Sequence, residues 1–306
     1  MEALPPRPRP TTPVVLITGC SSGIGAAAAR LFAAAGYRVF ASMRRPDRTS
    51  ALRDEATHAG WQLTTPALDV TSQSSVDMAV ADLLAETGGR LDVLVNNAGY
   101  YCVGPVEETT PEELTAQLET NLLGVLRMVR AVLPTMRAAG TGTIVNVSSI
   151  SGLVVLPIAG PYHASKFGLE ALTEALRYEV APFGVRVAAV EPGMIATSFH
   201  DNEKWAAAAR GADSPYRTVT AAYERVSRAA PRGRAEKVAA VIFRAATARR
   251  PRLRWRVGPT SFSGGVLRRL TPDWLYECLV KVVFLRGARA NARAARLARR
   301  GDVGPV

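Results

Sequence analysis

The chain alternates short apolar runs with longer segments whose apolar residues recur at helical spacing. Its first run, Val14-Val15-Leu16-Ile17, has the length and composition of a buried parallel strand. An alanine-rich, proline-free stretch from Ala26 to Ala34 follows, and such residues favour a helix. Further strands are expected near 38–42, 62–68, 91–96, 143–148, 185–191 and 253–257. This alternation predicts an α/β fold with a doubly wound, seven-stranded parallel sheet that has helices on both faces.

A long helix is expected to begin at Thr110. A threonine N-cap, a proline in the first turn and a capping-box glutamate mark its start. Pro134 should kink or end this helix. Apolar residues at helical spacing would form its core face: Leu114, Leu118, Leu122, Val125 and Val129.

The two ends of the chain differ from this central region in composition. Residues 1–12 are rich in proline and lack the apolar stretch of a signal peptide, which predicts an extended leader. Residues 13–258 would form one domain, followed by a basic helical extension over 259–306. No run approaches the ~20 apolar residues that cross a bilayer. The cysteines Cys20, Cys102 and Cys278 show no metal spacing, so we expect no metal site and a cytoplasmic, reducing environment.

A glycine-rich turn stands between the first predicted strand and helix. It reads Thr18-Gly19-Cys20-Ser21-Ser22-Gly23-Ile24-Gly25. Glycines permit a tight turn and a close approach of the backbone to a ligand, and the helix N-terminus then faces a pyrophosphate. A turn that only packs the helix on the sheet is the alternative. The strand–turn–helix context favours a Rossmann-type dinucleotide site.

A tyrosine and a lysine supply candidate chemistry. Tyr162 and Lys166 are four residues apart, so they would share one helix face. The lysine charge should lower the pKa of the phenol from its usual value near ~10, which suits acid–base catalysis. Ser149 would stabilise charge on a reacting oxygen. His163 is one position off that face and is interpreted as a bystander.

These residues together resemble the short-chain dehydrogenase/reductase family over roughly Pro13 to Phe199. The resemblance implies a catalytic set of Asn121, Ser149, Tyr162 and Lys166, in which Lys166 holds the nicotinamide ribose and Asn121 links the lysine through a water to solvent. It also implies homodimers or tetramers. The implied cofactor contacts come from Gly19, Ser21, Ser22, Gly23, Ile24 and Gly25; from Asp69 and Val70; from Asn97, Ala98 and Gly99; from Tyr162 and Lys166; and from Pro192, Gly193, Ile195 and Thr197.

The end of the second predicted strand indicates which cofactor is preferred. Family members that prefer NAD place an acidic residue there, which binds the ribose hydroxyls. Here the strand leads into Arg44-Arg45, with no carboxylate before Asp47. A guanidinium pairs with a phosphate, whereas a carboxylate would repel it. Arg44, with help from Ser22, therefore favours NADP(H) over NAD(H), although both arginines could be ordinary surface charges.

The substrate is predicted only as a class. Residues 194–230 correspond to the substrate lid of the family. The motifs look most like those of the steroid 17-beta and retinol dehydrogenase branch, which implies a hydrophobic ketone, aldehyde or alcohol. An acyl-ketone reductase, or a cofactor-binding sensor or scaffold on the same fold, is the alternative. The lid aromatics either contact such a substrate or pack among themselves: Phe199, Trp205, Tyr216 and Tyr223.

The C-terminal region that begins at Arg249 carries most of the net charge. From Arg249 onward there are fourteen basic and three acidic residues, which supply +11 of the total +12. Arg252, Arg254 and Arg256 alternate with Leu253 and Trp255, as in a strand with one polar face. A solvated basic face is the favoured interpretation, and peripheral contact with an anionic membrane is the alternative. No nucleic-acid motif accompanies the charge, so we expect no nucleic-acid partner.

Overall fold

The structure, a computed structural model, describes residues 12–48, 50–197, 203–211 and 213–285. Nearly all of the predicted leader and residues 286–306 of the predicted extension lie outside these ranges. The main sheet has seven parallel strands, as predicted, and the structure gives their order as β3-β2-β1-β4-β6-β7-β11. These strands are β1 Val14–Thr18, β2 Arg38–Ser42, β3 Leu63–Thr64, β4 Val93–Asn96, β6 Gly142–Val147, β7 Val185–Pro192 and β11 Arg254–Val257.

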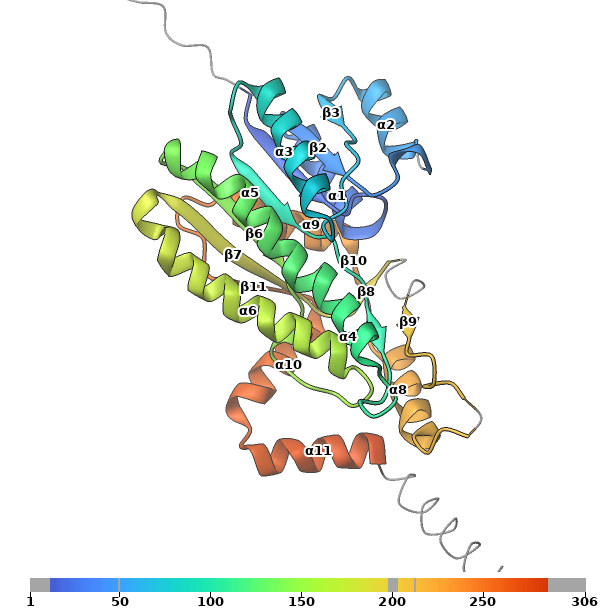
Figure 1. The fold of residues 1–306 in the computed structure, drawn as a ribbon. Coiled ribbons are helices and arrows are strands. Elements are labelled where there is room, and N and C mark those ends of the chain that lie inside the picture. The colour runs from blue at the N-terminus through green and yellow to red at the C-terminus, as the bar shows by residue number, and fades with distance from the viewer. Residues whose placement is uncertain (1–11, 49, 198–202, 212, 286–306) are drawn as a thin grey trace, which may run out of the picture.

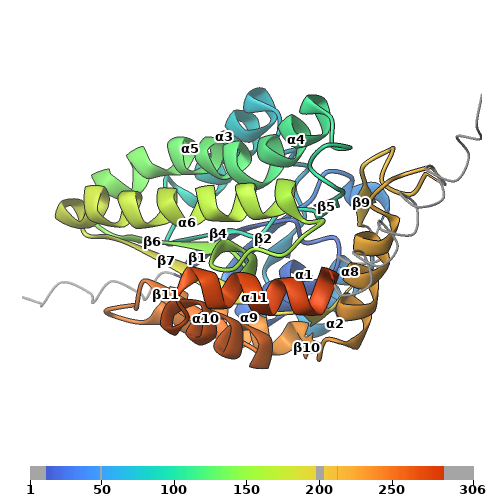
Figure 2. The same ribbon diagram turned by 90° about the horizontal axis from the view of Figure 1, so that it is seen from below.

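Helices cover both faces of the sheet, and the layers are clearest from below (Figures 1 and 2). One apolar cluster joins the sheet to α1 (Gly23–Ala34), α2 (Ala51–Ala59) and α9 (Ala235–Thr247). A second cluster joins the other face to α3 (Gln73–Thr87), α5 (Gly124–Ala138) and α6 (Gly160–Val180). The central strands bury side chains on both faces, which explains their continuous apolar runs.

One predicted strand is shorter than expected. The strand predicted over 62–68 is reduced to Leu63–Thr64, with one further bridge between Met43 and Ala67. Pro66 lies between these points, and a proline has no N–H to give to the ladder. Its carbonyl still accepts from the Met43 N–H at 3.2 Å.

The helix predicted from Thr110 is divided in two. The capping box at Thr110 and Glu113 starts α4 (Pro111–Leu118), and one π-helical turn, Glu119–Leu123, separates α4 from α5. π-Helical turns are frequent at functional sites, and this one carries Asn121. Of the two outcomes expected at Pro134, a kink or an end of the helix, the structure rules out the end, because α5 continues to Ala138. Met128, Val132 and Met136 bury one face of α5 on both sides of the proline, and this packing offsets the lost hydrogen bond.

Several short elements escaped the sequence analysis. Two pairs of two-residue strands, β5 (Cys102–Val103) with β9 (Lys204–Trp205) and β8 (Ile195–Ala196) with β10 (Gly233–Arg234), are too short to leave a periodic pattern. Besides α9, the last part of the described chain holds the helices α8 (Arg217–Ala229), α10 (Pro259–Leu270) and α11 (Asp273–Leu285). Within the described residues, no helix combines the length and apolar character needed to cross a membrane.

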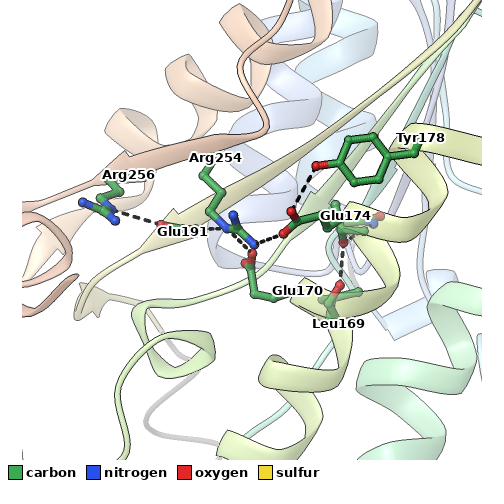
Figure 3. Close-up of polar contacts among 9 residues, drawn as sticks. Leu169, Glu170, Glu174, Tyr178, Glu191, Arg254 and Arg256 are labelled. Carbon is green, nitrogen blue, oxygen red and sulfur yellow. Dashed lines mark hydrogen bonds and ion pairs between the residues drawn. The ribbon is translucent and has the colours of Figure 1, made fainter. Parts of the chain in front are cut away.

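The arginines of β11 meet carboxylates behind α6 (Figure 3). The Arg254 guanidinium lies 2.9 Å from Glu170, 2.7 Å from Glu174 and 3.3 Å from Glu191. Arg256 lies 3.3 Å from the other oxygen of Glu191. Burial and, after it, the charge of Glu170 raise the pKa of the Glu191 carboxyl to about 7, although Arg256 and Arg254 oppose this shift. The polar face predicted for this strand therefore contacts buried carboxylates and ties the sheet edge to α6.

Candidate active site

A cavity of about 790 Å³ opens at the carboxyl ends of the parallel strands, where ligands bind in open α/β sheets. Ser149, Tyr162 and Lys166 line it together. Every predicted cofactor residue except Gly25 also lines it: Gly19, Ser21, Ser22, Gly23, Ile24, Arg44, Asp69, Val70, Asn97, Ala98, Gly99, Tyr162, Lys166, Pro192, Gly193, Ile195 and Thr197. Asn121 lies outside the lining.

The glycine turn is shaped by close backbone contacts. Gly19 has φ of +74°, and a Cβ there would stand 2.8 Å from Ala98 Cα. A Cβ at Gly25 would stand 2.3 Å from the Gly19 carbonyl oxygen, so this glycine acts by letting α1 pack against the turn. The first turn of α1 holds no acidic residue, which leaves the positive end of its dipole available to a phosphate. The turn therefore fits a dinucleotide.

Asn97 and Thr18 hold this turn against β4. The Asn97 side-chain amide donates to the carbonyls of Thr18 at 2.9 Å and Gly19 at 3.0 Å. The Thr18 hydroxyl oxygen accepts from the N–H groups of Asn97 and Ala98, both at 3.0 Å. In this structure the Asn97 side chain thus positions the glycine turn, a role that the sequence motif alone does not distinguish from direct cofactor contact.

The far end of the cavity is lined by Arg44 and Asp69. Arg44 directly follows β2 and Met43, and its side chain is exposed. Arg45 is also exposed but is absent from the lining. Asp69 accepts from the N–H and hydroxyl of Thr71 at 2.9 and 2.8 Å. The cation nearest the end of β2 is therefore placed to reach a ligand in the cavity.

Tyr162 is almost completely buried, with 6% of its surface exposed. Burial raises the pKa of its phenol to about 12, while a hydrogen bond with Ser149 lowers it. The Lys166 ammonium lies 5.7 Å from the tyrosine ring centroid, and its lowering of this pKa remains a prediction. The tyrosine is thus held as a phenol, the form that donates a proton.

Lys166 donates from Nζ to the Val147 carbonyl at 2.9 Å. Burial lowers the pKa of its ammonium to about 8, and the charge of Glu170 opposes this shift. The lysine is therefore fixed to the end of β6, on the same cavity wall as Ser149 and Tyr162. Glu170 is one helical turn away and belongs to the cluster of Arg254, Arg256, Glu170, Glu174 and Glu191, here called the Arg254 cluster. This cluster therefore acts electrostatically on the lysine through Glu170.

Asn121 binds groups other than the lysine. Its amide accepts from the Tyr100 N–H at 3.1 Å and donates to the Tyr100 carbonyl at 3.0 Å. It also donates to the Ser165 hydroxyl at 3.2 Å. Asn121 therefore joins the chain after β4 to α6, close to Tyr162. The water-mediated link to Lys166 remains a prediction.

His163 holds the loop between Ser149 and α6. Its Nδ1 lies 2.9 Å from the Ser151 carbonyl, and its Nε2 accepts from the Leu156 N–H at 3.0 Å. The two contacts require a neutral ring, and burial lowers the pKa of the imidazole. The histidine interpreted as a bystander thus positions the loop that carries Ser149.

An aromatic cluster lies beside Tyr162. The Tyr101 ring packs edge-on against Tyr162 with centroids 4.3 Å apart, and its hydroxyl is 2.7 Å from that of Tyr223. Trp205 and, from α11, Phe284 complete the cluster. Among the predicted lid aromatics, Trp205 and Tyr223 pack behind Tyr101, Tyr216 binds Glu107, and Phe199 lies outside the described residues.

Other lining residues gave no motif signal. Tyr100, Tyr101, Ile150, Met194 and Lys204 reach the cavity from loops and short strands. Only the fold brings them together. Lys204 also stacks on the Tyr100 ring with its ammonium 4.8 Å from the centroid, which no sequence spacing indicates.

Residues 13–207 match the family described as short chain dehydrogenase. The chain belongs to this family. A 3-ketodihydrosphingosine reductase of Bacteroides thetaiotaomicron is 41% identical over 189 residues, 62% of this chain and 66% of that protein. The match thus spans slightly less than two thirds of the reductase.

Solved short-chain dehydrogenases share the fold over most of the chain. One from Streptomyces avermitilis has a TM-score of 0.76 at 33% identity and covers 95% of this chain and 98% of its own. A Burkholderia phymatum member in complex with NAD has a TM-score of 0.73 at 28% identity, covering 84% and 93%. ElxO with NADP bound has a TM-score of 0.68 at 27% identity, covering 82% and 99%. The protein is thus a short-chain oxidoreductase whose structural relatives bind NAD or NADP.

Proposed function

We propose that this short-chain dehydrogenase is an NADP(H)-dependent carbonyl reductase or alcohol dehydrogenase for hydrophobic substrates. The observation that carries the proposal is the meeting of Ser149, Tyr162 and Lys166 on one buried wall of the cavity. When bound, the nicotinamide supplies the hydride chemistry. Ser149 hydrogen-bonds the carbonyl oxygen of the substrate, and Tyr162 donates the proton to that oxygen. Lys166 holds a positive charge on the same cavity wall.

The preference for NADP(H) is supported by Arg44. No carboxylate follows β2 before Asp47, and an exposed guanidinium lines the cavity at that point. A guanidinium attracts the additional phosphate of NADP(H), whereas the acidic residue of NAD-preferring members would repel it. Bound NADP in related structures is consistent with this preference.

A hydrophobic substrate is supported by the aromatic cluster beside Tyr162. Tyr101 offers an apolar ring to the cavity, backed by Tyr223 and Trp205. A long-chain ketone, as the name of the Bacteroides reductase implies for that enzyme, and a steroid- or retinoid-like ketone both suit such a wall. Lys204, also in the lining, favours a polar or anionic group beside the apolar portion of the substrate.

The test is oxidation of NADPH in the presence of steroid, retinoid, long-chain aliphatic and acyl ketones, followed through the nicotinamide absorbance. Turnover of at least one apolar ketone, with NADPH preferred to NADH, would support the proposal. Cofactor binding without turnover of any carbonyl in either direction would instead support the sensor or scaffold.

A further inference from the structure

We propose that α10 and α11 form a peripheral membrane-binding surface for bilayers that contain anionic lipids. In Figure 1 the two helices lie below the helices and strands of the main domain, and α10 contacts the sheet edge at β11. They belong neither to the catalytic set nor to the cofactor site. The proposal concerns their outer, apolar side.

The residues of α11 fall into four rows along the helix, because positions four apart lie on the same side. Tyr276, Val280 and Phe284 form the inner row, of which Phe284 is buried. The next row around the helix is charged and consists of Asp273, Glu277 and Lys281. The remaining two rows hold only uncharged residues, all exposed: Trp274, Cys278 and Val282, and beside them Leu275, Leu279 and Val283.

The preceding helix, α10, also exposes apolar residues. Phe262, Val266 and Leu270 form one row there and are 56%, 46% and 77% exposed. Leu267 is 46% exposed beside them. Exposed apolar patches over two helices mark interaction sites on soluble proteins. The Tyr276 hydroxyl donates to the Val155 carbonyl at 2.9 Å and fixes α11 with this side outward.

The charge of the neighbouring sequence selects an anionic bilayer as the occupant. Residues 286–306 directly follow α11 and contain six arginines and one aspartate. They offer few apolar residues with which to cover the patch, and a second copy of the chain would bring the same positive charge. Anionic headgroups complement the arginines, while the acyl region accepts Trp274 and the leucines.

The inner row of α11 connects this surface with the catalytic region. Phe284 and Val280 pack in the cluster that contains Tyr101, Tyr223 and Tyr162. If the protein acts on a lipophilic carbonyl, which rests on the proposed function, the substrate could pass from the bilayer into the cavity along this edge. Membrane binding itself requires no catalysis and is tested without cofactor or substrate.

The first experiment is co-sedimentation of the full chain with phosphatidylcholine vesicles and with vesicles that also contain phosphatidylglycerol. We expect binding to the anionic vesicles that weakens as salt rises. Leu279→Glu, which places a charge in the apolar rows, should lower the partition coefficient about tenfold or more. The matched control is Met78→Glu, because Met78 is an exposed apolar residue on α3, at 62% against 40% for Leu279; it should bind like the parent.

Two outcomes would overturn the proposal. One is the absence of binding to anionic vesicles at low salt. The other is equal binding by the parent and Leu279→Glu, which would assign the attraction to the arginines alone. If Leu279→Glu instead halves the mass of the free protein in analytical ultracentrifugation, and the parent does not bind vesicles, a second copy covers the patch.

A second measurement uses a substitution that keeps the apolar character of the two exposed rows of α11. Brominated phosphatidylcholine in anionic vesicles should quench tryptophan fluorescence of the parent, because Trp274 would enter the acyl region. Trp274→Phe should lose this quenching while still sedimenting with the vesicles. Trp61→Phe is the control, because Trp61 is partly buried and lies just before β3, at the sheet edge opposite β11. This variant should retain the quenching. No quenching of the bound parent would exclude insertion of α11.

Discussion

The two ends of the cavity are built in different ways. At the end of β1 and β2, the backbone of a glycine turn and an exposed side chain, Arg44, face the ligand. At the end of β6, three polar side chains, Ser149, Tyr162 and Lys166, are each less than 9% exposed. Burial shifts the pKa values of the tyrosine and the lysine in opposite directions. Changes at the buried end should therefore abolish chemistry, whereas changes at the exposed end should alter preference.

The largest effect is expected from Tyr162→Phe. The substitution removes only the phenolic hydroxyl, so turnover should fall by a factor on the order of 10² or more while NADPH binding survives. Single-turnover kinetics and a cofactor titration measure the two properties separately. Tyr223→Phe is the matched control, since its hydroxyl is buried but outside the cavity lining. Near-parental turnover of Tyr162→Phe would contradict the assigned proton donor.

The ion pairs of Arg254 with Glu170, Glu174 and Glu191 stabilise the α6 and β7 region beside the buried end of the cavity. Arg254→Met tests their contribution. The substitution leaves Glu170 and Glu191 without their shared guanidinium, and removing one partner of a buried ion pair costs about 3 kcal/mol of unfolding free energy. Denaturant unfolding measures the loss. Arg30→Met removes the exposed pair with Glu55, whose side chains are 40% and 45% exposed, and should cost less than about 1 kcal/mol. Equal losses would show that the Arg254 cluster gives no special support.

At the exposed end, Arg44→Asp should change cofactor preference with little loss of stability. A carboxylate replaces an attractive charge near the additional phosphate, so the ratio of kcat/KM for NADPH to that for NADH should fall roughly 10-fold or more. Arg45→Asp carries the same charge change one residue away, outside the cavity lining. It should leave the ratio within a few-fold of the parent. An unchanged ratio in Arg44→Asp would place the phosphate elsewhere.

The difference between the two ends also explains what the sequence predicts well. Strand runs and the glycine turn depend on neighbours in the chain, so the seven-stranded sheet was predicted correctly. The split of the helix at Glu119–Leu123 and the shortening of the strand at Pro66 depend on packing and on one missing N–H. These details leave a weak local pattern or none.

The candidate site follows the same division. Tyr162 and Lys166 are predicted by their spacing, but their pKa shifts depend on burial by loops distant in sequence. The effect of the lysine charge on the tyrosine pKa remains a prediction, and the bond from Lys166 to the Val147 carbonyl is a contact that no sequence spacing indicates. The partners of Arg254 come from α6 and β7, 63 to 84 residues earlier in the chain, and no short motif connects them.

The smallest expected effect concerns the loop at the buried end. His163 is neutral in the folded protein, and burial holds its pKa below the usual value of about 6.5. Below that value the unfolded chain binds a proton that the folded protein resists, so stability falls as the pH is lowered from about 7 to 5 and is unaffected by this group at higher pH. Protonation also removes the acceptor for the Leu156 N–H, a loss of about 1 kcal/mol. Denaturant unfolding across this pH range should show the decline in the parent, a shallower decline in His163→Asn and the parental slope in His58→Asn, since His58 is exposed on α2. An identical slope in His163→Asn would show that other groups cause the acid sensitivity and that this end of the cavity does not depend on a neutral imidazole.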